Sequence, residues 1–321
     1  MNKFKVLLSI FFITINLPAN AMENSSQTIN DGRTVAIVSE GPWKVCTGFL
    51  YSEKIVLTAG HCLFNMNTKS LWPKLYVGMP GQEYTKNIKT IMVEKIIFPS
   101  NWSFKTDNEL TDKNDFGILI LSEAIPIIGK TIIANENQIN EFIKNKTLIS
   151  TVGYGRQGVD HDQNDNTFPK YAQFPIVSLL EVQQELDMAT SIFGQKKYWG
   201  MQIHLLETPN GPSTCSGDSG SAFYIKINDD FIYLGPLSWG IGGMPACSGK
   251  GWQSNRMYIG SVAAYEYLDL IKQAENYVGS KQIENVPVSY DKITIKCYKG
   301  KIIKKVYGSN PKCPKGYKVR V

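Results

Sequence analysis

The hydrophobic positions from residue 34 onward fall into short runs separated by turn residues. These runs are rich in Val, Ile, Leu, Thr, Phe and Tyr, and they occupy residues 34–38, 45–51, 54–58, 74–77, 90–98, 117–121 and 147–152. Closely spaced short strands of this kind are typical of an all-β sandwich or barrel, whereas alternating α and β units would place a helical pattern between successive strands. The pattern therefore predicts an all-β fold.

Helical patterns are scarce. One amphipathic segment covers residues 261–278, with Val262, Tyr265, Leu268 and Ile271 on one stripe. An apolar stripe at this spacing predicts a helix that packs against the barrel near the end of the β-rich region. A weaker helical pattern lies near residues 180–188.

The first residues have the pattern of an export signal. Lys3 and Lys5 precede an apolar run at 6–17, and Ala19-Asn20-Ala21 supplies the small residues that signal peptidase recognises. The apolar run is too short to cross a membrane. We expect residues 1–21 to be a signal peptide and the protein to be secreted or periplasmic.

Six cysteines in an exported chain indicate three disulfides rather than a metal site. They lie at Cys46, Cys62, Cys215, Cys247, Cys297 and Cys313. Their spacing suggests that each pairs with its neighbour in sequence, although the spacing alone does not fix the connectivity.

Charge is distributed unevenly along the chain. Residues 291–321 carry ten Lys and Arg and one Asp, a net charge of +9, whereas residues 22–290 carry 22 basic and 27 acidic residues. The overall net charge of +6 therefore describes the C-terminal tail and not the body of the protein.

Three segments hold side chains suited to acyl-transfer chemistry. Ser219 lies among small residues in 214–220, where backbone N–H groups can converge on an oxygen beside the serine. His61 follows a strand and precedes a cysteine, and imidazole acts as a general base near neutral pH. Asp115 precedes the apolar run 117–121, which would draw its carboxylate inward toward a hydrogen-bonding partner. Each residue alone also has an ordinary structural explanation.

Together, the order His61, Asp115, Ser219 resembles the chymotrypsin/trypsin family of serine proteases. The resemblance is carried by Thr-Ala-Gly-His-Cys, Asn-Asp before the apolar strand, and Gly-Asp-Ser-Gly, and it covers about residues 34–278. It implies two packed six-stranded antiparallel β-barrels with a C-terminal helix. We expect this protease domain to span residues 22–279, with the barrels dividing near 140–148.

The resemblance also implies roles for individual residues. Ser219 would be the nucleophile, His61 the general base, and Asp115 the residue that orients the imidazole. The N–H groups of Gly217 and Ser219 would form the oxyanion hole, and Asp218 would pair with a new N-terminal amine, which we expect from cleavage at or just after Ala21.

The same resemblance extends to substrate binding and to two disulfides. Ser238, Trp239 and Gly240 would pair with the substrate backbone as an added strand. Cys46–Cys62 and Cys215–Cys247 match family bridges.

The residues that would set specificity depart from the trypsin pattern. Ser213, six residues before Ser219, stands where trypsin-like members carry an aspartate, and Thr214 follows it. We therefore expect primary specificity that is not trypsin-like. Arg256 could lie near the base of the pocket and favour acidic side chains, or an open apolar pocket could favour hydrophobic ones.

The tail forms its own small module. After a linker at 280–290, alternating apolar and basic residues around Lys299-Gly300 predict a β-hairpin, with Cys297 and Cys313 as its disulfide. We expect residues 291–321 to be a basic module that either binds a polyanionic envelope component or serves as a solubilising or sorting appendage. We expect no specific nucleic-acid recognition.

These observations predict a secreted serine endopeptidase that acts on peptide or protein substrates as a monomer, with no cofactor and no metal. The main alternative is a catalytically silent protein on the same fold that binds an envelope or extracellular partner. An exported esterase using the same triad is a lesser alternative.

Overall fold

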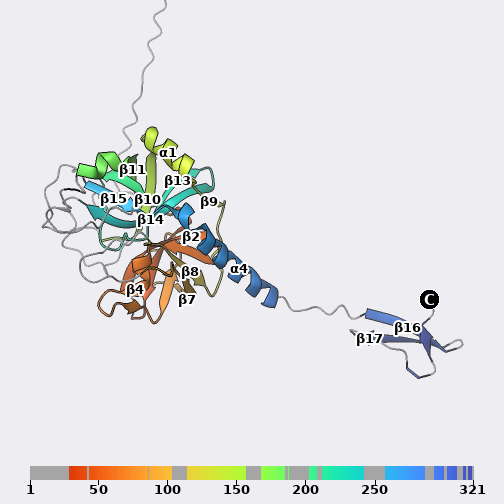
Figure 1. Cartoon of the computed structure of the whole chain (residues 1–321). Coiled ribbons are helices and arrows are strands. Elements are labelled where there is room, and N and C mark those ends of the chain that lie inside the picture. Colours follow the sequence, from red (N-terminus) through yellow and green to blue (C-terminus); the bar gives the residue numbers. More distant parts are fainter. Residues whose placement is uncertain are drawn as a thin grey trace, which may run out of the picture. The chain divides into compact units, whose positions relative to one another are not determined.

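A computed structural model describes residues 29–41, 43–85, 87–102, 114–156, 168–184, 187, 202–207, 212–241, 257–285, 293–299, 302–308, 314–315 and 317–319. The chain divides into two compact units between Glu275 and Asn276. Figure 1 shows the strand-rich first unit and the short strands of the C-terminal unit.

The first barrel is a closed ring of six antiparallel strands in the order β1-β2-β3-β8-β7-β6. Its strands are β1 (Thr34–Ser39), β2 (Trp43–Ser52), β3 (Ile55–Thr58), β6 (Leu75–Gly78), β7 (Thr90–Ile97) and β8 (Gly117–Leu121). Every residue of β1, β3 and β8 is buried, because these strands have neighbours on both faces. The barrel interior is filled by aliphatic side chains including Val35, Ile37, Leu50, Val77 and Leu119.

The second barrel is also a closed ring of six strands. It consists of β10 (Leu148–Gly153), β11 (Lys170–Val177), β12 (Ile203–Glu207), β15 (Met257–Ser261), β14 (Asp230–Ile241) and β13 (Ala222–Ile227), and pairing of β13 with both β14 and β10 closes the ring. A short strand, β9 (Thr131–Ile133), adds to β14 in parallel. The predicted fold of two six-stranded antiparallel barrels is therefore confirmed.

The two barrels meet over a buried layer of aromatic rings. Phe49 of β2 lies 5.9, 5.5 and 5.3 Å, centre to centre, from Tyr224, Phe231 and Tyr233 of the second barrel. Arg33, which is 1% exposed, donates hydrogen bonds to Leu50 O of β2 at 2.7 Å and to Gly129 O, in the segment between β8 and β9, at 2.8 Å. Because its donors are satisfied by carbonyl groups, this buried guanidinium ties the layers together.

Helices lie at the surface and at the end of the β-rich region. The segment predicted to be helical over 261–278 forms a 3-10 turn, η2 (Ala264–Tyr267), followed by helix α4 (Leu268–Asn285). Tyr267 of η2 stacks on Phe116, with 4.6 Å between ring centres. A second helix, α1 (Glu136–Lys144), was not predicted; it begins with a capping box between Asn135 and Gln138. In the part of the chain that is described, no helix is long and apolar enough to span a membrane.

The C-terminal unit contains a β-hairpin. Strands β16 (Ile293–Lys299) and β17 (Ile302–Gly308) pair antiparallel, and β18 (Lys318–Val319) adds to β16. The prediction of a hairpin around Lys299-Gly300 is consistent with this pairing. Lys299, Lys315 and Lys318 are exposed.

Candidate active site

Strand pairing in the first barrel brings His61 and Asp115 to the same edge. Thr58, the last residue of β3, pairs with Gly117, the first residue of β8. His61 follows β3 on the 3-10 turn η1 (Gly60–Leu63), and Asp115 precedes β8 by two residues. Neighbouring antiparallel strands therefore place the imidazole and the carboxylate side by side, although 54 residues separate them in sequence.

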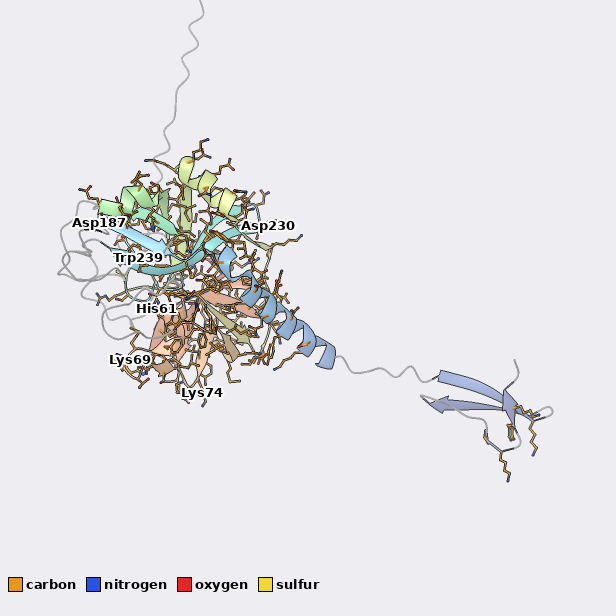
Figure 2. All side chains as sticks on the ribbon, viewed as in Figure 1. His61, Lys69, Lys74, Asp187, Asp230 and Trp239 are labelled. Atoms are coloured by element: carbon orange, nitrogen blue, oxygen red, sulfur yellow. A yellow bond between two sulfur atoms is a disulfide. The ribbon has the colours of Figure 1, made fainter. Side chains whose placement is uncertain are left out.

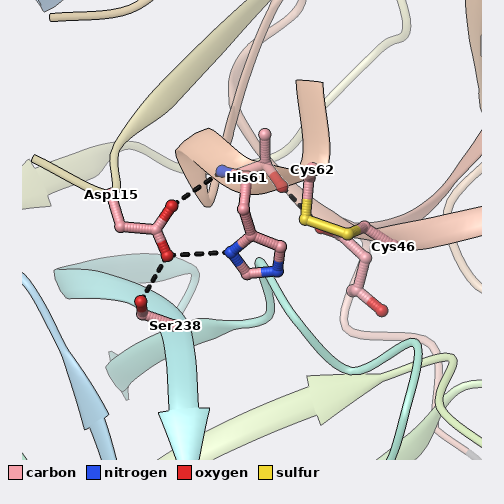
Figure 3. Close-up of polar contacts among 7 residues, drawn as sticks. Cys46, His61, Cys62, Asp115 and Ser238 are labelled. Carbon is pink, nitrogen blue, oxygen red and sulfur yellow. Dashed lines mark hydrogen bonds and ion pairs between the residues drawn. A yellow bond between two sulfur atoms is a disulfide. The ribbon is translucent and has the colours of Figure 1, made fainter. Parts of the chain in front are cut away.

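Two hydrogen bonds join this pair (Figure 3). The Asp115 carboxylate accepts from the His61 backbone N–H at 2.7 Å through Oδ1, and Oδ2 lies 2.8 Å from His61 Nδ1. Ser238 Oγ of β14 donates a further hydrogen bond to the same Oδ2. The histidine ring is therefore held by one nitrogen, and its Nε2 is left to face the cleft.

The charges of the pair stabilise each other. Burial alone would raise the pKa of the Asp115 carboxyl, but the adjacent imidazole and the hydrogen bonds from His61 and Ser238 hold that pKa below its ordinary value. Burial opposes protonation of His61, but the Asp115 charge and hydrogen bond outweigh it and raise the histidine pKa. This arrangement favours a charged imidazolium next to a carboxylate.

Ser219 lies on a glycine-rich turn where the second barrel contacts the first. The Ser219 carbonyl accepts from the Thr47 N–H at 2.9 Å, and the Gly220 N–H donates to Leu237 O at 2.7 Å. Gly220 has a φ of +83°, and a Cβ there would lie 2.1 Å from Thr58 Oγ1. Only glycine fits this close approach between barrels, so the turn that carries Ser219 is fixed by its neighbours.

Asp218 is buried behind the same turn. Its Oδ1 accepts from the Gly155 N–H at 2.6 Å and its Oδ2 from the Cys215 N–H at 2.8 Å. Burial raises the pKa of the Asp218 carboxyl to about 6, although these two hydrogen bonds and the charge of Lys44 act in the opposite direction. The two hydrogen bonds fasten the turn that contains Gly217, which has a φ of +97°, to Gly155.

The backbone N–H groups of Gly217 and Ser219 flank this turn. Neither has a hydrogen-bond acceptor among the described residues. Ser219 is partly exposed and Gly217 is buried, and backbone donors without an internal acceptor can bind a ligand oxygen that reaches them.

The predicted pocket residues Ser213 and Thr214 contact a carboxylate that the sequence analysis missed. Glu207, at the end of β12, is fully buried; it accepts from Thr214 N and Thr214 Oγ1 at 2.8 Å each and from Ser213 Oγ at 3.1 Å. Burial, with a smaller contribution from Asp218, raises the pKa of Glu207 to about 7 despite these hydrogen bonds. The available signal was an acidic residue at the end of an apolar strand, comparable to Asp115, which lies just before one.

The segment Ser238-Trp239-Gly240 lies on β14, next to the catalytic candidates. Ser238 contacts Asp115, as described above, and Trp239 is largely buried, 6.0 Å from the His204 ring. In Figure 2, His61 lies where the two barrels meet and Trp239 lies on the second barrel. Arg256 lies outside the described residues.

A disulfide borders the site. Cys46 of β2 is bonded to Cys62 of η1, directly after His61, as the resemblance implied. Cys215 is also disulfide-bonded. The side chains of Cys247, Cys297 and Cys313 lie outside the described residues, so the other two predicted pairings stay predictions.

His61 and Ser219 line one cavity of about 650 Å³ beside this disulfide. The cavity lies over β2, η1 and the hairpin formed by β4 (Phe64–Asn65) and β5 (Ser70–Leu71). The structure thus brings all three predicted triad residues to one place, His61 and Asp115 by direct contact and Ser219 across the cavity.

A double β-barrel with a histidine-aspartate pair and a serine turn between the barrels defines the chymotrypsin-like class of protein. The Trypsin family model matches residues 22–251, which is more than half of the chain, and the protein belongs to this family. It is similar to trypsin delta and trypsin gamma of Drosophila erecta, each 24% identical over 259 residues that cover 75% of this chain and 90% of the relative. It is also similar to trypsin delta of Drosophila melanogaster, 23% identical over 257 residues with the same coverage.

Proposed function

We propose that this protein is a serine endopeptidase in which Ser219, His61 and Asp115 form the catalytic triad. The hydrogen bond between Asp115 Oδ2 and His61 Nδ1 carries the proposal, because it fixes the tautomer that leaves Nε2 able to accept a proton. Family membership supports the same reaction class.

The chemistry follows from these contacts. Ser219 Oγ attacks the substrate carbonyl carbon while its proton passes to His61 Nε2. The Asp115 carboxylate stabilises the resulting imidazolium through its hydrogen bond to Nδ1. The imidazolium then gives its proton to the departing amine as the C–N bond breaks, leaving an acyl group on Ser219. Water attacks this ester with His61 again as the base, the bond to Ser219 Oγ breaks, and the acid product leaves.

The N–H groups of Gly217 and Ser219 supply the oxyanion hole in this proposal. Their lack of acceptors among the described residues supports the assignment, because a preorganised donor stabilises the developing oxyanion without rearrangement. Loss of one such donor typically costs about 3 kcal/mol of transition-state stabilisation.

Primary specificity is proposed not to be trypsin-like, since Ser213 replaces a pocket aspartate. The polar atoms of Ser213 and Thr214 are engaged by Glu207, whose raised pKa favours its neutral form below pH 7. A carboxyl group behind the pocket base disfavours an acidic substrate side chain at any pH at which it is ionised. Of the two alternatives left open by the sequence, this supports the hydrophobic one.

Export and tail binding complete the proposal. The N-terminal signal pattern and the Cys46–Cys62 disulfide support a secreted or periplasmic location, with the amine released near Ala21 as the partner of Asp218. The exposed lysines at 299, 315 and 318 support binding of the tail to a polyanion. Deletion of residues 291–321 would then abolish salt-sensitive binding to envelope preparations, and binding unchanged by deletion would refute this role.

A fluorophosphonate probe tests the proposed catalytic serine directly. We expect stoichiometric labelling of the processed protein at Ser219 and none of Ser219→Ala. Ser216→Ala is the matched control, because Ser216 lies on the same turn with its side chain exposed. A processed protein that is not labelled would contradict the catalytic function and favour the silent binding protein.

A further inference from the structure

The cavity beside the Cys46–Cys62 disulfide lies apart from the segment expected to bind the acyl side of a substrate. That segment, residues 238–240, belongs to the second barrel and does not line the cavity. The cavity instead extends from His61 and Ser219 over the first barrel. A peptide that crosses Ser219 therefore leaves the acyl-side strand and enters this cavity with its leaving-group side.

The walls of the cavity carry large apolar side chains. Trp43 of β2 is 57% exposed and Met66, in the turn between β4 and β5, is 51% exposed, and both line the cavity with Val45, Phe64 and Trp72. Exposed aromatic and Met side chains gathered around one hollow mark a binding surface, since monomeric proteins otherwise expose such residues singly.

The cavity is held open by fixed neighbours. Phe64 stacks on Trp102 with 4.0 Å between ring centres and contacts Phe98 edge to face at 5.4 Å. The backbone N–H of Trp72 donates to Leu63 O at 3.0 Å, which anchors the end of the β4–β5 hairpin to η1. A preformed hollow of about 650 Å³ is large enough for more than one substrate side chain.

The charged residues at the cavity do not oppose an apolar occupant. Lys44 is only 1% exposed, and its Nζ lies 5.1 Å from the centre of the Tyr84 ring. Glu40, at the rim, forms an ion pair with Lys74 at 2.8 Å. Trp43 and Met66 are therefore the most exposed of the large apolar side chains that line the cavity.

We propose that this cavity, which lies on the leaving-group side of Ser219, selects large apolar or aromatic side chains there, through Trp43 and Met66. The assignment rests on the proposed peptidase function. It adds a second determinant of substrate choice, one that does not depend on the Ser213 pocket.

Transfer of an acyl group to an added amine tests binding on the leaving-group side of Ser219 separately from binding of the acyl side. An activated p-nitrophenyl ester acylates Ser219 and releases nitrophenol; an added amino-acid amide then attacks the acyl carbon, its amine proton passes to His61, a C–N bond forms, and the bond to Ser219 Oγ breaks. Competition between the amide and water is measured as the ratio of peptide to acid product.

We expect phenylalanine amide and leucine amide to capture the acyl group about ten-fold more efficiently than glycine amide or aspartate amide, which corresponds to burial of one apolar side chain. Trp43→Ala and Met66→Ala should each reduce this preference about three-fold or more. Met92→Ala is the matched control, because Met92 is 47% exposed on β7 and does not line the cavity. The nitrophenol burst shows that each variant is intact.

Equal capture of phenylalanine and glycine amides, or a preference unchanged in both cavity variants, would overturn the assignment while leaving the peptidase intact. Absence of any nitrophenol burst in the unmodified protein would instead overturn the proposed function, and the assignment with it.

Discussion

Asp115 and Glu207 are both buried carboxylates, one beside the first barrel and one at the end of a strand in the second. Asp115 contacts an imidazole and two further donors, and its pKa is held below the ordinary value. Glu207 accepts three hydrogen bonds from neutral groups, and its pKa is raised to about 7. Each carboxylate accepts three hydrogen bonds, yet the pKa of Asp115 is lowered and the pKa of Glu207 is raised.

The difference shows that direct contact with an imidazole, rather than the number of hydrogen bonds, decides whether burial is overcome. Asp218 sharpens this interpretation: it is buried, accepts two backbone hydrogen bonds and has Lys44 as a nearby charge, yet its pKa is raised to about 6, so a nearby cation does not by itself offset burial. The lowered pKa favours the ionised form of the carboxylate that pairs with histidine, which is the state that the proposed triad needs.

The largest effect is expected from Asp115→Asn. The asparagine oxygen can still accept from the His61 N–H, but its NH₂ group would face Nδ1 and force that nitrogen to accept. Nε2 would then carry the proton and could not act as a base, so kcat should fall about 10⁴-fold near neutral pH. Steady-state hydrolysis of a chromogenic ester measures this. Ser238→Ala, which removes one donor and leaves the tautomer, should cost far less, and a similar loss in both variants would contradict the account.

Glu207→Gln should stabilise the protein at alkaline pH. Because the folded pKa of about 7 lies above the ordinary glutamate pKa of 4.5, the unfolded state releases this proton first and stability falls as pH rises from 4.5 through 7. The glutamine variant lacks this loss, so its unfolding free energy should exceed that of the unmodified protein by on the order of 3 kcal/mol at pH 8 and match it near pH 4.

Urea denaturation at several pH values measures the difference. Glu141→Gln, an exposed change on α1, is the control. An identical pH dependence for Glu207→Gln and the unmodified protein would show that Glu207 is not the group whose ionisation costs stability.

The smallest change in stability is expected from breaking a solvent-exposed ion pair on the protein surface. Lys146 Nζ lies 3.3 Å from Glu181 Oε2, with both side chains substantially exposed. Lys146→Gln should change the unfolding free energy by less than about 1 kcal/mol, because solvent screens the attraction. A loss comparable to that of a buried pair would mean that exposure does not weaken such contacts here, which would undermine the comparison between Asp115 and Glu207.

The strands of the first barrel could be predicted from sequence because their apolar runs are continuous and bounded by turn residues. The pairing of β3 with β8, which joins His61 to Asp115, could not be derived from local pattern, because strand pairing depends on contacts between distant residues. The family resemblance supplied that information. Helix α1 was missed because its signal is a capping box and polar residues rather than an apolar stripe.

Glu207 illustrates the other limit. A glutamate at the end of an apolar run has the same local pattern whether it faces solvent or the interior. Its three hydrogen bonds come from Ser213 and Thr214, six and seven residues further along the chain, so only the folded chain shows that it is buried. The cavity lining likewise depends on the folded chain, because Trp43 lies at the start of β2 and Met66 lies in the turn between β4 and β5.

The most direct test of the proposed peptidase is the appearance of new peptide termini. A denatured protein library would be incubated with the processed protein and with Ser219→Ala, and the new N-termini would be identified by mass spectrometry. The account predicts internal cleavages made by the unmodified protein alone, with large apolar residues enriched directly after the cut. Equal numbers of new termini with both proteins would contradict it.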